Sequence, residues 1–197
     1  MTFDPNATGS PARTHRDYYK ALYQATLTIS SSLELDQVLQ SVVSSITEVM
    51  ETKACSLRLF ERSSGLLHLG AVHGLSEDYL TKGPIEVSHS PIDVEVLSGK
   101  PVYIQDVRSD DRFQYPQAAK HEGIISVLCV PLEVRGEAIG VMRVYTNTPT
   151  TFHDDDIQFL SVLASLSALA IENARLYESV KRSYEGVIDA LWGTTIR

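Results

Sequence analysis

The chain has 197 residues, of which 43% are hydrophobic, so it is long enough to form one domain with a full hydrophobic core. Its net charge of −8 at pH 7, without any basic tract, argues against a protein that binds the phosphate backbone of nucleic acids. No segment has the form of a signal peptide or an uncharged membrane span, so we expect a cytoplasmic protein that makes no membrane contact.

The N-terminal part predicts a tail and two helices. Residues 1–16 are rich in Pro, Asn, Gly, Ser and Thr, and we expect them to form a flexible tail. Apolar residues then recur at helical spacing from Tyr19 to Ile29 and, more regularly, from Leu35 to Met50. The serine run at 30–32 separates these two predicted helices.

The middle of the chain predicts a sheet. Strand patterns occupy residues 54–61 and 66–72, and a four-residue connection that ends in Gly65 joins them. Short helical turns at 75–80 and 92–97 precede further strands at 101–104, 126–132 and 138–145, the last two joined by a tight turn at 135–137. Strands grouped in this way, with helices before and after them, predict an α+β fold with a central antiparallel sheet.

The last third of the chain predicts one long helix. Asp154, Asp155 and Asp156 suit a first helical turn, where unpaired N–H groups favour negative charge, so the helix should begin near residue 153. Spacings of four and three then alternate along the helix, as in the seam of a coiled coil. The predicted homodimer interface consists of Leu166, Leu169, Asn173, Leu176, Val180 and Val187.

Asn173 would occupy an a position of this seam, where a polar residue favours one register and a parallel two-stranded pairing. The alternative is that the helix packs only on its own sheet. In that case Asn173 would bond to a neighbouring backbone group.

Several segments together resemble a GAF domain, in that family's order and over residues 18–177. They are 54–60, the turn at 74–76, 101–107 with 110–113, 126–132, the Gly136 turn with 139–141, and 172–177. The resemblance implies a sensory or regulatory module at residues 17–177. In such a module a twisted antiparallel sheet has a helical layer on one face and, on the other, a small-molecule pocket covered by short helices and loops. Residues 178–197 would extend the last helix.

The resemblance does not identify a ligand. Residues 146–148 lack the Asn-Lys pair found in cyclic-nucleotide-binding members, although Phe152, Asp155 and Asp156 match the second half of that signature. Bilin attachment would need a cysteine near a histidine in the pocket loops, and the sequence has none there. We therefore expect neither a bilin nor a metal, and the cofactor remains unknown.

Strand alternation predicts a candidate site on one sheet face. Arg58 and His68 fall on the same face of the first predicted hairpin and nearly opposite one another. Arg143 would join them if the strand at 138–145 neighbours the first strand, as the resemblance implies. Two arginines and a histidine suit a small anionic effector with a carboxylate or phosphate group. The alternative is a partly solvated face whose arginines pair with Glu or Asp.

Three aromatic residues belong to the segments that cover the pocket in the family: Tyr79, Phe113 and Tyr115. They either close over a ligand or form the outer part of the core. Cys55 and Cys129 lie in apolar runs without a CxxC partner, which is typical of core residues in a reducing compartment. The family's free-methionine-sulfoxide reductases need a reactive cysteine set, and this chain departs from that pattern.

We therefore expect no catalytic residues. The leading hypothesis is a non-enzymatic sensory domain that binds a small effector and signals through dimerising terminal helices to an output domain or partner protein. The alternative is a dimerisation or scaffold module whose pocket is filled by its own side chains.

Overall fold

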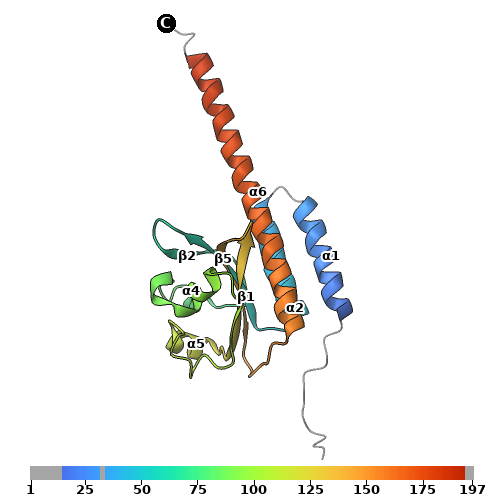
Figure 1. Ribbon diagram of the computed structural model, residues 1–197, viewed down its shortest axis with the longest axis vertical. Coiled ribbons are helices and arrows are strands. Elements are labelled where there is room, and N and C mark those ends of the chain that lie inside the picture. Colours follow the sequence, from blue (N-terminus) through green and yellow to red (C-terminus); the bar gives the residue numbers. More distant parts are fainter. Residues whose placement is uncertain (1–14, 32–33, 194–197) are drawn as a thin grey trace, which may run out of the picture.

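Two layers of helices enclose a five-stranded antiparallel sheet (Figure 1). The computed structural model describes residues 15–31 and 34–193, and the side chains of residues 17–27 and 34–185. The strands are β1 (Ala54–Glu61), β2 (Leu66–His73), β3 (Val102–Ile104), β4 (Ser126–Val134) and β5 (Glu137–Thr146), in the order β2-β1-β5-β4-β3. This arrangement confirms the predicted α+β fold and the predicted strands.

Three helices cover one face of the sheet: α1 (His15–Ser31), α2 (Leu35–Val49) and α6 (Asp154–Gly193) (Figure 1). α2 packs on β1 and β2, and α6 packs chiefly on β4, because each buries an apolar stripe against the strands. α1 lies outermost, with the Tyr18 ring stacked on Phe159 at a centroid distance of 4.1 Å. The Tyr18 hydroxyl donates to the Asp156 carboxylate at the start of α6. α1 begins at His15, so the last two residues of the predicted tail are helical, and residues 1–14 lie outside the described part.

Short helices and loops cover the opposite face (Figure 1). They are α3 (Glu77–Leu80), the 3₁₀ turn η1 (Val87–His89), α4 (Pro91–Leu97) and α5 (Pro116–Glu122), of which η1 and α5 were not predicted. Local capping explains two of them, since the Ser76 hydroxyl accepts from the Tyr79 N–H and the Ser90 hydroxyl accepts from the Asp93 N–H. This second layer forms a core of its own against the sheet.

Helix α6 has 40 residues, so at 1.5 Å per residue it is about 60 Å long. Its first half is buried against the sheet at Leu160, Leu163, Ala168 and Ile171, and its second half projects well beyond the sheet (Figure 1). By length and composition alone, α6 is apolar enough to cross a membrane. The buried stripe accounts for much of this apolar character.

A β-bulge changes the alternation of side chains in β2. Leu57 pairs with Ala71 and Arg58 pairs with Leu69, so Gly70 is an extra residue between the two pairs. A Cβ atom on Gly70 would lie 2.9 Å from a methyl group of Leu57, which leaves little room for a side chain at the bulge. Residues of β2 before Gly70 are therefore turned to the face opposite to the one that simple alternation predicts.

Candidate functional site

Two buried arginines lie on the sheet face under the short helices. Arg58 on β1 and Arg143 on β5 are both 7% exposed. β1 and β5 are antiparallel neighbours, with Ser56 opposite Arg143 and Arg58 opposite Val141. The structure thus confirms that Arg58 and Arg143 share one face and lie on adjacent strands, as the sequence predicted.

Asp93 forms a buried ion pair with Arg143. Asp93 is in the first turn of α4, is fully buried, and accepts a hydrogen bond from Nη2 of Arg143. Burial alone lowers the pKa of Arg143, but the Asp93 carboxylate raises it, and the net pKa lies well above the ordinary value. Within the described residues, Oδ2 of Asp93 and Nε of Arg143 have no hydrogen-bond partner. The pair therefore keeps one free acceptor and one free donor, which is costly in a buried site.

Arg58 has no carboxylate partner among the described residues. Its Nη1 donates a 3.4 Å hydrogen bond to the Leu67 carbonyl, and its Nε is buried without a partner. Burial lowers the pKa of Arg58, and the positive charge of Arg143 acts in the same direction. Arg58 thus holds a buried positive charge that forms no ion pair with any carboxylate of the described residues.

Lys82 adds a third cation that the sequence analysis did not identify. Its Nζ lies 3.7 Å from the centroid of the Tyr79 ring and donates a 2.9 Å hydrogen bond to the Tyr79 carbonyl. Burial, together with the charges of Arg58 and Arg143, lowers the pKa of Lys82 to about 7. Lys82 follows α3 in a polar loop, a position where a lysine is ordinarily exposed, so nothing in its sequence context marks it as a site residue.

The three predicted aromatic residues do lie over this face. Tyr79 is buried and meets the Tyr145 ring edge to face at a centroid distance of 6.2 Å. The Tyr115 hydroxyl donates a 2.6 Å hydrogen bond to the Pro84 carbonyl, which fastens the loop that carries Lys82. Phe113 is 8% exposed and belongs to the same buried cluster.

A second set of bonds fastens α3 and α5 to the sheet. Glu122 of α5 accepts from Nζ of Lys53 at 2.7 Å and from the Ser76 N–H at 3.2 Å. Burial opposes ionisation of Glu122, but these hydrogen bonds stabilise the carboxylate and lower its pKa. The cover over the arginines is therefore tied down at both ends.

The space left between the cover and the sheet is small. The volume that water molecules can enter is about 10 Å³, which is enough for about one water. The side chains around it are Tyr79, Lys82, Ile85, Ser90, Ile92, Asp93, Phe113, Gln114, Tyr115 and Arg143. In this conformation the pocket is nearly filled by its own side chains.

The placement predicted for His68 was wrong. Because of the bulge at Gly70, His68 pairs with Leu59 on the helical face of the sheet, opposite to the face of Arg58. Its side chain is 56% exposed and lies 3.2 Å from the Glu61 carboxylate. His68 therefore does not belong to the arginine site.

The two cysteines are poor nucleophiles. Both are free and buried in strands, Cys55 under the helices and Cys129 beside Arg143. Burial raises the pKa of both thiols, that of Cys129 to about 12, so neither forms a thiolate readily. In the described part of the chain, no three His, Cys, Asp or Glu side chains gather as a metal ion would require.

A larger hollow of about 450 Å³ lies elsewhere, at the turn end of β4 and β5. Its lining includes Arg62 and Glu137, which form an exposed 3.2 Å ion pair. None of the buried, unpartnered side-chain atoms of the described residues lies there. We therefore place the candidate site at the arginines rather than at this hollow.

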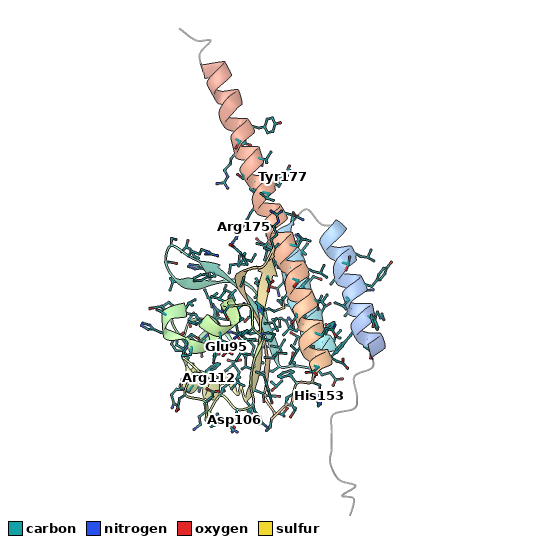
Figure 2. All side chains as sticks on the ribbon, viewed as in Figure 1. Glu95, Asp106, Arg112, His153, Arg175 and Tyr177 are labelled. Atoms are coloured by element: carbon teal, nitrogen blue, oxygen red, sulfur yellow. The ribbon has the colours of Figure 1, made fainter. Side chains whose placement is uncertain are left out.

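Four of the six residues predicted for the dimer seam are exposed along α6. Leu169, Leu176 and Val180 are 46%, 51% and 54% exposed, and Asn173 is also exposed. Leu166 is half-buried against the helical core, and the side chain of Val187 lies outside the described part. On the projecting half of α6, Tyr177 is exposed as well (Figure 2).

Comparison with known proteins agrees with this architecture. Residues 34–171 match the GAF domain model. The chain belongs to the GAF domain family. The GAF domain of a phosphoenolpyruvate-protein phosphotransferase from Coxiella burnetii superposes with a TM-score of 0.74 at 22% identity, covering 83% of this chain and 98% of that one.

Two curated relatives are longer proteins. A Nif-specific regulatory protein of Herbaspirillum seropedicae is 26% identical over 81% of this chain and 30% of its own length. A methyl sulfide methyltransferase-associated sensor of Methanosarcina acetivorans is 23% identical over 79% of this chain and 16% of its own length. This GAF domain chain therefore spans less than a third of either relative. GAF domains are sensory or regulatory domains of signalling proteins, and this chain is a domain of that class.

Proposed function

We propose that this chain is a non-enzymatic sensory module that binds a small anionic effector at Arg58, Lys82 and Arg143 and signals through dimerising terminal helices. The observation that carries the proposal is the charge of the pocket. Three basic side chains lie at the site, and Asp93 pairs with one of them, Arg143. An anion would supply the missing negative charge, and Arg58 offers it an unpartnered donor.

The aromatic residues Tyr79, Phe113 and Tyr115 form the cover that an effector would have to move. Because the free space is near that of one water, binding of a larger anion would lift the loop between α3 and α4. The free Oδ2 of Asp93 would accept a hydrogen bond from a hydroxyl or amino group of the same effector. The cover and the cations together thus favour an effector with one anionic and one donor group.

β5 connects the pocket with the helices. Arg143 faces the pocket, and its neighbour Val144 lies in the core that includes Leu160 and Leu163 of α6. β4, which pairs with β5, makes the main contact with α6. A shift of β5 on effector binding would therefore reach the helix that projects from the domain.

A second copy of this chain is the partner proposed for α6. Val162, Leu169 and Leu176 are exposed at seven-residue intervals, and Tyr19 and Tyr23 of α1 are exposed at 71% and 66%. Apolar residues at this spacing suit a two-stranded coiled coil. The same proposal includes an output domain or partner protein that receives the signal from the dimer. It also includes a cytoplasmic location.

A thermal-shift screen with inorganic phosphate, small carboxylates and nucleotides tests the effector site. At about a hundred times its dissociation constant, a bound effector adds roughly 2.7 kcal/mol to the free energy of unfolding and raises the melting temperature. Arg58→Met should abolish this rise. His68→Ala is the matched control, because His68 lies on the other face and should leave the rise intact. An effector whose shift survives both Arg58→Met and Lys82→Met would place the site elsewhere.

Sedimentation at tens of micromolar tests the dimer. Leu176→Asp with Val180→Asp should convert a dimeric chain to monomers, because it would bury like charges in the seam. Arg182→Asp is the control, since Arg182 lies on the opposite side of the helix from Val180. A monomeric wild-type chain would contradict the proposed dimer.

One observation favours the alternative, a scaffold module without a ligand. The residual cavity of about 10 Å³ is what a self-filled pocket would have. A screen without hits, combined with a dimeric chain, would support the scaffold and contradict the effector site.

A further inference from the structure

Lys82 is an amine held among cations rather than beside a counter-ion. In the described part of the chain no carboxylate lies within ion-pair distance of its Nζ, whose hydrogen bond goes to the Tyr79 carbonyl at 2.9 Å. Arg58 on β1 and Arg143 on β5 face it from the sheet, and both charges disfavour the ammonium form. Glu122 on α5 and the face of the Tyr79 ring act in the opposite direction.

The balance of these groups, in which burial is the largest, brings the pKa of Lys82 to about 7. A large share of the amine is therefore uncharged near neutral pH, unlike an exposed lysine, whose pKa is about 10.4. A neutral amine that donates one N–H to the Tyr79 carbonyl keeps its lone pair free. Lysines desolvated beside other cations are the ones that act as nucleophiles in proteins.

The pocket next to Lys82 limits the size of what this amine can attack. The free volume of about 10 Å³ holds about one water, so any adduct on Lys82 requires the cover to move, and the smallest adduct requires the least movement. The surrounding charges favour a product that carries negative charge, because Arg58 lacks a counter-ion. Carbon dioxide is a small uncharged electrophile, and its adduct with an amine is an anion.

We propose that Lys82 is a carbon dioxide site, at which the Nζ amine forms a carbamate held by Arg58 and Arg143. The lone pair of the neutral amine forms the N–C bond, one C=O electron pair moves to oxygen, and Nζ releases one proton to solvent. No oxidant or reductant is needed. The proposal rests on the anionic site proposed above, since the carbamate would be the anion that this site binds.

The adduct would replace a neutral or positive group by a negative one within the electrostatic influence of two guanidinium groups. This change supplies the charge that the pocket lacks, and Arg58 and Arg143 can hydrogen-bond the two carbamate oxygens. Arg143 would then lie between two anions, the Asp93 carboxylate and the carbamate. We therefore expect α4, which carries Asp93, to shift when the carbamate forms.

The test uses the whole chain in buffer with ¹³C-labelled bicarbonate, followed by an alkylating agent that converts carbamates to stable esters and by peptide mass spectrometry. We expect a ¹³C-labelled ester on the peptide that contains Lys82, and none in Lys82→Arg. Lys120, which is exposed on α5, is the internal control and should stay unlabelled. Arg58→Met should lower the occupancy roughly tenfold, the equivalent of one pKa unit.

Absence of label on Lys82, or label no greater than on Lys120, would overturn the carbamate. The anionic site is tested separately by the melting temperature in carbon-dioxide-free buffer with inorganic phosphate. If phosphate raises it and Lys82 is unlabelled, the carbamate fails and the anionic site stands. If Lys82 carries no ¹³C label but gains a stable mass with a small oxo acid and borohydride, the amine forms an imine and not a carbamate, and the carbamate is overturned.

Discussion

The two faces of the sheet come from the same strands but bury different chemistry. Under α1, α2 and α6 the strands present an apolar surface that includes Leu57, Leu128 and Met142. The opposite face has three of the four buried charged side chains of the described residues, Arg58, Asp93 and Arg143, and the fourth, Asp156, caps α6. The helical face therefore supplies stability, whereas the pocket face keeps charges that stability alone does not require.

The largest effect should come from breaking the buried ion pair. Arg143→Met would leave Asp93 buried and unpaired, and we expect a loss of about 3–5 kcal/mol in the free energy of unfolding. The double variant Arg143→Met with Asp93→Leu should recover most of this loss, because it leaves no unpaired charge. Urea unfolding measures both. If the double variant were as unstable as the single one, the pair would contribute packing rather than charge.

Neighbouring residues on β1 allow a direct contrast of the two faces. Leu57→Ala should cost about 2–5 kcal/mol, because Leu57 is fully buried in the helical core. Arg58→Met, one residue further on the other face, should cost less than about 1 kcal/mol or stabilise the fold, since it removes a buried cation that has no counter-ion. Equal losses for the two variants in urea unfolding would mean that Arg58 is a structural residue.

Much of the fold was predictable because it depends on periodicity. Alternation located the five strands, and helical spacing located α2 and α6, whose buried stripes are regular. The face of α1 was less clear, because the residues that it buries include the small Ala21 and Ala25, while the larger Tyr19 and Tyr23 are exposed. Side-chain size in the sequence did not reveal which side of α1 meets the core.

The site was predictable only in part, and the misses have physical reasons. Arg58 followed from strand alternation, and Arg143 from the strand neighbour that the family resemblance implied. His68 was misplaced, because one bulge at Gly70 reverses the faces of the preceding residues. Asp93 occupies the first turn of a short helix, where a carboxylate already has a local explanation as a helix-dipole partner. Its contact with Arg143 joins positions fifty residues apart, and only the tertiary structure brings them together.

The smallest effect concerns Lys82, and it depends on pH. Its pKa is about 7 in the folded chain and about 10.4 in an unfolded one, so between these values the unfolded chain binds a proton that the folded chain does not. Stability from this group therefore rises with pH across that window, and the full cost of the lowered pKa is present below about pH 7. Lys82→Met lacks the group, so the difference in the free energy of unfolding between wild type and variant should shift in favour of wild type as the pH rises from 7 to 10. Because the side chain is only half-buried, solvent screening keeps the shift modest.

An anion at Arg58 and Arg143 would stabilise the charged lysine and flatten this dependence, so the same measurement with and without inorganic phosphate links the titration to the pocket. Parallel curves for wild type and Lys82→Met would show that Lys82 titrates as an ordinary exposed lysine, outside the influence of the two arginines.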